Sequence, residues 1–262
     1  MLSDEQVRQF HASGFCVARV PVSAETIKRV ADTVWELCPP TFDRERPKTW
    51  QGELEDCCKT QSIKDRGGRV KFRECLRGER WLYELTAANA EILAAIRDLI
   101  DEPLPPQYVR GLYPVFPLKQ RLFARKPRQA CGHCDQHKFQ VGVVLYLSDV
   151  LPPGGGFTVW PGSHHEMMRH HGTLGGEDRL SSFDEAVERI QASIAPVEIT
   201  GPAGTVIFWH QRLVHTAGIN TLRIVRHATL CDFKNERFLA AAEDAPTGAW
   251  ATWSARVRQL AA

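Results

Sequence analysis

Apolar side chains in the first 38 residues are spaced as a helix, a strand and a second helix. Ser3 is a typical helix N-cap, Gln6 stands at the capping-box position, and Gly14 is a typical residue at a helix end. Residues 15–20 form an apolar run of strand length, and Ser23 then precedes a second helical pattern. The apolar face of that second helix consists of Ile27, Val30, Ala31, Val34 and Leu37.

The next region contains a polar stretch and then the strongest helical pattern of the chain. Residues 39–80 are rich in charge, Pro and Gly, so we expect loop and irregular structure suited to covering the mouth of a site. Residues 81–100 predict one amphipathic helix, and several prolines follow it. Its apolar side consists of Leu85, Ala88, Ile92, Leu93, Ile96 and Leu99.

From residue 107 the pattern changes to short β-rich runs separated by Gly and Pro clusters. Serial short strands with such turn signals favour a β-sandwich or barrel over a doubly wound sheet. Residues 187–192 and the tail from Gly248 have helical patterns, and Trp81, Trp250 and Trp253 are expected to pack in the core. The expected strands cover residues 108–112, 119–124, 140–147, 157–160, 194–199, 205–209 and 222–233.

These patterns predict one domain over residues 1–262 that is mainly β with flanking helices. Residues 1–106 form a mainly helical part, residues 107–235 form the sheet core, and residues 236–262 form a helical tail. The sequence contains no internal repeat and no convincing interdomain linker.

Composition narrows the class of protein. Of the 262 residues, 43% are apolar and 24% are charged, and the net charge of +2 gives no electrostatic footprint for nucleic acid or a membrane. The apolar runs are too short to span a bilayer, and the first residues lack the pattern of a secretory signal. Eight cysteines are too few for a disulfide scaffold, so we expect reduced thiols and a cytoplasmic location.

Eight of the ten histidines lie between His133 and His215, which suggests a metal site. His133 and Asp135 stand two positions apart just before a predicted strand, so their side chains point the same way, while Cys134 points to the other side. An imidazole and a carboxylate are two arms of the two-His, one-carboxylate arrangement that suits non-haem Fe(II). His210 and His215 are both candidates for the third ligand.

An arginine further along the chain offers a place for an organic anion. Arg226 stands eleven residues after His215 and shares a strand face with Ala228 and Leu230. A planar guanidinium among small apolar side chains suits two-point binding of a carboxylate. Arg223, three residues earlier, is a rival for the same role.

Several segments together resemble the phytanoyl-CoA dioxygenase-like family of Fe(II)/2-oxoglutarate oxygenases. They occur in the family's order: residues 133–135 (His-Cys-Asp), residues 155–164 (Gly-Gly-Phe-Thr-Val-Trp-Pro-Gly-Ser-His), residues 204–215, Asn220, and residues 226–230 (Arg-His-Ala-Thr-Leu). The opening residues 2–7 and the Gly-Phe pair at positions 14 and 15 are similar as well. The resemblance covers most of the chain and thins between residues 39 and 100.

The resemblance implies a double-stranded β-helix, the jelly-roll core of cupin-like proteins. It assigns His133, Asp135 and His215 to Fe(II), and so decides between the two candidate third histidines. It assigns Arg226 to the distal carboxylate of 2-oxoglutarate, and it places Tyr146 where the family often has a side chain beside this cosubstrate.

The implied activity is that of an Fe(II)/2-oxoglutarate-dependent dioxygenase, which uses O2 and releases succinate and CO2 while it hydroxylates a small-molecule substrate. The carboxylate of Asp135 favours oxygen chemistry, because halogenating relatives have a small residue there. Cys134 and Thr205 depart from the family's usual Gln and Asp, but neither is a ligand position. Desaturation, cyclisation and epimerisation stay open as outcomes, and the sequence carries no signal about oligomeric state.

Other interpretations of the same residues also stay open. Cys131, Cys134 and His137 could belong to a zinc site, although the chain has only one Cys-x-x-Cys pattern next to a histidine. The fold could instead serve a cupin-like metal-dependent isomerase or a non-catalytic small-molecule binding module. Neither of these classes needs Arg226, which therefore discriminates between them and an oxygenase.

Two further groups of residues have both a structural and a functional interpretation. A set of four histidines forms either a solvated loop or a lid that contacts substrate: His164, His165, His170 and His171. A basic stretch forms either a solvated strand edge or a contact for an anionic substrate: Arg121, Arg125, Lys126 and Arg128.

Overall fold

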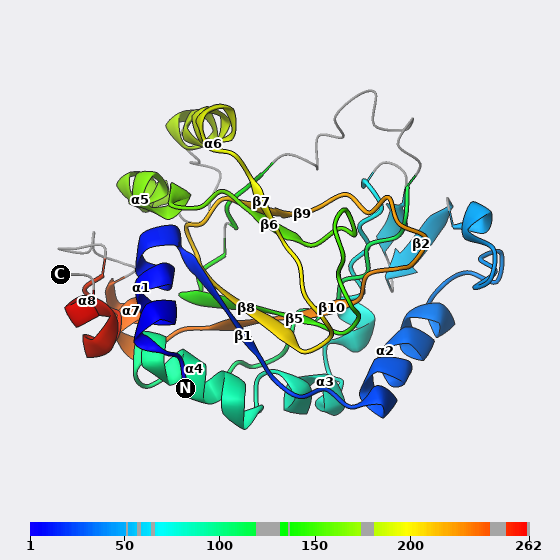
Figure 1. The fold of residues 1–262 in the computed structure, drawn as a ribbon, viewed down its shortest axis with the longest axis horizontal. Helices are drawn as coiled ribbons and strands as arrows, with labels where there is room; N and C mark the ends of the chain where they lie inside the picture. The colour runs from blue at the N-terminus through cyan, green and yellow to red at the C-terminus, as the bar shows by residue number, and fades with distance from the viewer. Residues whose placement is uncertain are drawn as a thin grey trace.

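The structure, a computed structural model, describes residues 1–50, 52–56, 59–63, 66–118, 132–135, 137–173, 181–241 and 250–260. Its centre consists of two antiparallel sheets that face each other (Figure 1). The larger sheet has the strand order β1-β8-β5-β10-β4, and the smaller sheet has the order β7-β6-β9. The strands are β1 (Phe15–Arg19), β4 (Gly111–Leu112), β5 (Val141–Tyr146), β6 (Phe157–Val159), β7 (Val197–Ile199), β8 (Thr205–His210), β9 (His215–Ala217) and β10 (Ala228–Phe233).

A buried apolar cluster fills the space between the two sheets. Its side chains come from both sheets, for example Val144 on β5, Trp209 on β8 and Phe157 on β6. All residues of β5 and β8 are buried, because helices cover the outer face of the larger sheet while the smaller sheet covers its inner face. The prediction of a mainly β fold with flanking helices is confirmed, and the two facing antiparallel sheets are those of a jelly roll.

Helices from both ends of the chain pack around the larger sheet, and two further helices lie beside the smaller one (Figure 1). The first group is α1 (Asp4–Ser13), α2 (Ala24–Glu36), α3 (Arg80–Leu85), α4 (Ala90–Ile100), α7 (Glu236–Ala241) and α8 (Ala255–Leu260). The second group is α5 (Ser163–Met167) and α6 (Ser181–Ser193). Short 3-10 helices lie at η1 (Pro47–Thr49), η2 (Glu74–Leu76) and η5 (Met168–Thr173).

The ends of the first two helices follow local sequence signals. The Ser3 hydroxyl accepts a hydrogen bond from Gln6 N, and the Gln6 side chain accepts one from Ser3 N, which is the predicted capping box. Gly14 ends α1 with a φ of 81°, a conformation that glycine adopts at little cost. Ser23 caps α2 by accepting a hydrogen bond from Thr26 N.

The prediction of a single helix over residues 81–100 is wrong, because α3 and α4 are separate helices. Asn89 starts α4, since its side-chain oxygen accepts hydrogen bonds from the backbone N of Glu91 and of Ile92. A short polar side chain that bonds its own backbone competes with helix continuation. The periodic apolar pattern continues across this break and therefore does not reveal it.

The polar stretch over residues 39–80, which we expected to be irregular, contains regular structure. β2 (Glu53–Asp56) and β3 (Lys59–Ser62) form an antiparallel hairpin. Residues 69–72 then extend the larger sheet beyond β4 through antiparallel bridges. The close approach of this segment requires glycine at position 111, where φ is 99° and a Cβ would lie 2.0 Å from a backbone oxygen.

Several other elements differ from their predicted bounds. The strand predicted from residue 222 begins at Ala228, and the one predicted over residues 108–112 has two residues. The strand predicted over residues 205–209 is β8, which ends at His210, and His215 begins β9 in the other sheet. The region after position 163 is helical rather than a loop, and α6 is longer than the predicted residues 187–192.

Some predictions fall outside the described residues: the strand over residues 119–124, the basic stretch between Arg121 and Arg128, and Cys131 of the Cys-x-x-Cys pattern. Trp253 is buried, and Trp81 and Trp250 are partly buried against the core, as predicted. Among the described ranges, no helix has the length and hydropathy needed to cross a membrane.

Candidate active site

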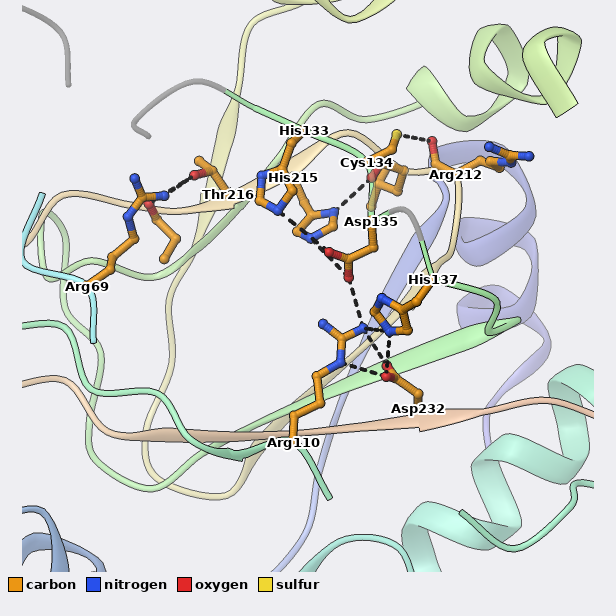
Figure 2. Close-up of polar contacts among 12 residues, drawn as sticks. Arg69, Arg110, His133, Cys134, Asp135, His137, Arg212, His215, Thr216 and Asp232 are labelled. Carbon is orange, nitrogen blue, oxygen red and sulfur yellow. Dashed lines mark hydrogen bonds and ion pairs between the residues drawn. The ribbon is translucent and has the colours of Figure 1, made fainter. Parts of the chain in front are cut away.

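Three side chains from two distant segments meet beside the smaller sheet (Figure 2). The candidate ligand atoms of His133, Asp135 and His215 all lie within 4.8 Å of one another. Nε2 of His133 is 3.7 Å from one carboxylate oxygen of Asp135, and Nε2 of His215 is 3.8 Å from the other. Donor atoms this close together could hold one metal ion between them.

The backbone explains how these side chains meet. His133 lies beside β9, where His133 N donates to His215 O and His215 N donates to His133 O, both at 2.9 Å. Asp135 follows two positions later on the same side, as the sequence predicts. Cys134 points to the opposite side, where its buried thiol donates to Arg212 O at 3.2 Å (Figure 2).

The surroundings of His215 leave one ring nitrogen available for a metal. Nδ1 lies 2.9 Å from Leu213 O, so the proton on Nδ1 is donated to that carbonyl and Nε2 keeps its lone pair. Burial, reinforced by the nearby His133, lowers the pKa of His215 to about 4. The neutral, metal-binding form therefore predominates at neutral pH.

A buried ion-pair network holds Asp135 from the other side (Figure 2). Arg110 Nη2 donates to Asp135 Oδ2 at 2.9 Å, while Arg110 Nε and Nη2 donate to the two oxygens of Asp232 at 2.6 and 2.8 Å. His137 Nε2 lies 2.7 Å from Arg110 Nη2 and 2.9 Å from Asp232 Oδ2. We call these four residues the Arg110 network.

The Arg110 network decides the charge of Asp135. Burial alone would raise the pKa of Asp135, but the Arg110 guanidinium, together with His133 and His215, outweighs it. The pKa of Asp135 is therefore held well below its usual range, and the group is a carboxylate at neutral pH.

Arg226 lines the same cavity as the three candidate ligands and is 4% exposed. Its Nε donates to Gly155 O at 2.9 Å and its Nη1 donates to Tyr113 O at 3.1 Å. Within the described part of the chain, Nη2 of Arg226 has no hydrogen-bond partner and the guanidinium has no carboxylate partner. Arg223 is exposed and does not line the cavity, so it is not a rival for this position.

Tyr146 lies behind Arg226 rather than in the cavity wall. The guanidinium carbon of Arg226 is 5.8 Å from the centre of the Tyr146 ring. The Tyr146 hydroxyl donates to Ile199 O and accepts from Phe157 N, both at 2.7 Å. Because these backbone groups occupy the hydroxyl, the position suits support of Arg226 and not direct contact with a cosubstrate.

A cavity of ≈380 Å³ connects the candidate metal ligands with Arg226. Part of its wall is apolar and is formed by Val70, Pro114, Val115, Val144, Phe157, Ala217 and Leu230. The cationic side chains in the wall are Arg66, Arg69, Lys71, Arg110 and Arg226. Asp135 is the only carboxylate among the described lining residues.

Other histidines considered from the sequence lie away from this cavity. His210 is buried at the end of β8, where its ring stacks on Trp253 at 4.8 Å and its Nδ1 accepts from Arg212 N at 2.9 Å. His164 is fully buried with Nε2 2.9 Å from His11 O, so neither the solvated-loop nor the lid interpretation holds for it.

Sequence reasoning missed Arg110 and Lys71. Arg110 is a charged residue within an expected strand, which is a weak signal, and Lys71 is one of many charges in a polar stretch. The partner of Arg110, Asp232, is 122 positions away in the chain. No local pattern connects residues so far apart, so their pairing appears only in the fold.

The sequence matches a known protein family. The profile of the family described as Phytanoyl-CoA dioxygenase (PhyH) matches residues 10–228, which is most of the chain. The chain belongs to the phytanoyl-CoA dioxygenase family. The matched range includes His133, Asp135, His215 and Arg226, so the resemblance seen in the sequence is confirmed at the level of the family.

Individual proteins with similar sequences or structures share less than 30% of their residues with this chain. L-proline trans-4-hydroxylase from Streptomyces griseoviridis is 27% identical over 94 residues, a match that spans 31% of this chain and only 35% of the hydroxylase. HygX from Streptomyces hygroscopicus, solved with nickel and 2-oxoglutarate bound, has a TM-score of 0.54 at 17% identity, covering 90% of this chain and 88% of that one. EctD from S. alaskensis, solved with 2-oxoglutarate and 5-hydroxyectoine, has a TM-score of 0.55 at 18% identity, covering 89% and 76%. At these identities the solved structures show a shared fold.

Proposed function

We propose that the protein is a non-haem Fe(II)/2-oxoglutarate-dependent dioxygenase that hydroxylates a small molecule and releases succinate and CO2. The observation that carries the proposal is one cavity that contains both a two-His, one-carboxylate donor set and a buried guanidinium without a carboxylate partner in the described chain. Membership in the phytanoyl-CoA dioxygenase family supports it.

The donor set fits Fe(II). Two imidazole nitrogens and one carboxylate oxygen on one side of a cavity leave the other coordination positions open, as non-haem iron oxygenases require. His133, Asp135 and His215 would hold the ion, and Arg110 would keep Asp135 ionised and oriented. When bound, Fe(II) supplies the chemistry that couples O2 and 2-oxoglutarate to oxidation of a substrate C–H bond.

The surroundings of Arg226 fit the distal carboxylate of 2-oxoglutarate. Two backbone carbonyls hold Nε and Nη1, so the guanidinium has a fixed orientation before any ligand arrives. Burial lowers the pKa of Arg226, and an incoming carboxylate would compensate the cost of burying this charge. Tyr146, packed beneath the guanidinium, would support this position.

A small-molecule substrate and a cytoplasmic location belong to the same proposal. The cavity of ≈380 Å³ is at the small end of ligand sites, which range from about 300 to 1,000 Å³, and it must hold the cosubstrate too. HygX and EctD, which share the fold, were solved with the small molecules hygromycin B and 5-hydroxyectoine.

Succinate formation tests the proposal directly. Purified protein with Fe(II), 2-oxoglutarate and air should form succinate, faster when a coupled substrate is present. Arg226→Met should raise the 2-oxoglutarate concentration for half-maximal rate more than about tenfold, since it removes a charge-assisted pair. It should leave Ni(II) affinity within about twofold, because Arg226 would contact the cosubstrate and not the metal. The exposed Arg223→Met is the matched control.

Two results would point to the alternative classes. An isomerase would need the metal but neither 2-oxoglutarate nor O2, and a binding module would form no succinate under any condition. Parallel loss of Ni(II) and 2-oxoglutarate binding in Arg226→Met would indicate misfolding of that variant, so circular dichroism accompanies each titration.

A further inference from the structure

Residues 66–71 contribute part of the cavity wall, and residues 69–72 extend the larger sheet. Val70 N donates to Pro114 O at 3.0 Å, and Phe72 N donates to Leu112 O at 2.9 Å. Successive side chains of an extended segment point to opposite faces. Val70 and Phe72 belong to the outer core, while Arg69 and Lys71 line the cavity, which Val70 also borders.

Neighbouring structure holds this segment in place. Gln61 on β3 clamps the backbone of Lys71: Gln61 Nε2 donates to Lys71 O at 2.8 Å, and Lys71 N donates to Gln61 Oε1 at 3.0 Å. Arg69 Nε donates to Arg66 O at 3.0 Å, and Arg69 Nη1 donates to the hydroxyl of Thr216 at 2.8 Å (Figure 2). Thr216 directly follows the candidate ligand His215, so the wall is tied to the metal site. We call Arg66, Arg69 and Lys71 the cationic wall.

The ammonium group of Lys71 has no direct partner among the described residues, although Asp135 lies near enough to act on its charge. That ammonium group makes no hydrogen bond and no ion pair with any residue that the structure describes. Burial is the main reason that the pKa of Lys71 is lowered to about 8. Arg66 is also partly buried, and its Nε has no partner in the described chain. Half-buried cations that make no direct ion pair are typical of sites that receive an anion.

The cosubstrate does not account for this excess charge. An Fe(II) ion, the Asp135 carboxylate, the 2-oxoglutarate dianion and the Arg226 guanidinium together would be neutral, and Arg110 is already paired with Asp232. The charged groups that act on Lys71 are Asp135 and neighbouring arginines, whereas Tyr146 and Glu198 act on Arg226. Lys71 and Arg226 therefore lie in different electrostatic surroundings within one cavity.

We propose that the cationic wall is the substrate subsite and that it binds a carboxylate of a small organic acid, with Lys71 as the main contact. The acid's hydrocarbon part would lie against Pro114 and Val115, which line the cavity and pair with this segment through the hydrogen bond from Val70 N to Pro114 O and the bridge between Arg69 and Val115. The inference rests on the proposed oxygenase function and names its substrate class: a small molecule with an anionic end and an oxidisable C–H bond. A carboxylate fits the limited volume and the single free ammonium better than a nucleotide or a thioester of coenzyme A.

The test uses protein loaded with Ni(II) and 2-oxoglutarate, and ligand-observed NMR titration with isobutyrate and its neutral analogue isobutyramide. The acid should bind at least about tenfold more tightly than the amide, because only the acid pairs with Lys71. Lys71→Met should abolish that preference, whereas Lys48→Met, which removes an exposed lysine, should preserve it. Both variants should bind 2-oxoglutarate within about twofold of the wild type.

Several outcomes would overturn the inference. Equal binding of acid and amide by the wild type would remove the anion subsite. A loss of 2-oxoglutarate affinity in Lys71→Met as large as that in Arg226→Met would make Lys71 part of the cosubstrate site. Tighter binding of methyl phosphate than of isobutyrate would replace the carboxylate by a phosphate.

The oxygenase proposal fails separately. Failure of the wild type to bind 2-oxoglutarate would overturn the proposed function, and the acid and amide titrations would then be repeated with Ni(II) alone. A preference for the acid in that form that Lys71→Met abolishes would keep the anion subsite, and its absence would remove it.

Discussion

Arg110 and Lys71 are two basic side chains in one cavity, and their pKa values are shifted in opposite directions. Arg110 is buried and Lys71 is half-buried, and burial by itself lowers the pKa of each. Arg110 has two carboxylate partners, Asp135 and Asp232, and its pKa is raised. Lys71 has none in the described chain, and its pKa falls to about 8. The charge of Arg110 is therefore neutralised within the folded structure, whereas that of Lys71 is available to a ligand.

The two parts of the site have different roles. The Arg110 network fixes the carboxylate that would hold the metal, so its groups are already satisfied before a ligand binds. The cationic wall is fixed through its backbone and through Arg69, but the ammonium of Lys71 is left for a partner. A preorganised metal site thus shares one cavity with a wall that a substrate would complete.

The largest expected effect is on metal affinity, when the carboxylate of Asp135 in the Arg110 network is removed. Asp135→Ala should lower Ni(II) affinity by at least about a hundredfold, because even the outer partners of metal ligands contribute about 10- to 100-fold. Isothermal titration calorimetry measures the affinity, and the thermal transition of the metal-free protein is the control for folding. Affinity close to that of the wild type would show that the ion is held elsewhere.

Breaking the Arg110 network itself should cost stability. Arg110→Met leaves Asp135 and Asp232 buried without their cation, which should reduce the free energy of unfolding of the metal-free protein by about 3 kcal/mol. Urea unfolding measures this change. Arg189→Met, which removes an exposed ion pair with Glu166, is the matched control and should cost less than about 1 kcal/mol. A bound Ni(II) ion would compensate the negative charge of Asp135, so Arg110→Met should reduce the free energy of unfolding less when Ni(II) is present. An equal reduction with and without Ni(II) would contradict this explanation.

The cationic wall predicts a pH dependence of anion binding. The charged and titratable groups around Lys71 are Asp135, Arg66, Arg73, Arg110 and the nearby Tyr113, whose pKa is raised to about 12. Between pH 7 and 9 these arginines and this tyrosine keep their protonation state, while the ammonium loses its proton as the pH passes about 8. Isobutyrate affinity should therefore fall about tenfold over this range.

That profile is measured by repeating the NMR titration at several pH values on the protein loaded with Ni(II) and 2-oxoglutarate. The profile of Lys71→Met should be flat, because the titrating group is absent. A wild-type profile as flat as that of the variant would exclude Lys71 as the titrating contact.

The smallest effect is expected at Cys134, between the two ligands but on the opposite face. Its thiol is buried and donates to Arg212 O, and serine keeps a donor there. Cys134→Ser should therefore leave Ni(II) affinity within about twofold, as judged by calorimetry. A large loss of bound metal would revive the zinc interpretation of the Cys-x-x-Cys pattern.

Local signals were sufficient for part of the fold. Ser3, Gln6 and Gly14 decide the ends of α1, because capping depends on neighbouring residues. The break at Asn89 and the hairpin of β2 and β3 were missed, because polar side chains in those segments conceal regular structure from an apolar pattern. The end of β8 was predicted to within one residue, but the placement of His215 in the other sheet was not, since that switch is a property of the fold.

The sequence by itself determined two of the three candidate metal ligands, His133 and Asp135. His133 and Asp135 share a face because alternate residues of an extended segment do so wherever that segment lies. Tertiary structure decided that His215 and not His210 joins them, that Arg110 pairs with Asp135 across 25 positions, and that Lys71 reaches the same cavity. The reason is physical: side-chain alternation is a short-range geometric rule, whereas the balance of buried charge depends on which distant segments exclude water together.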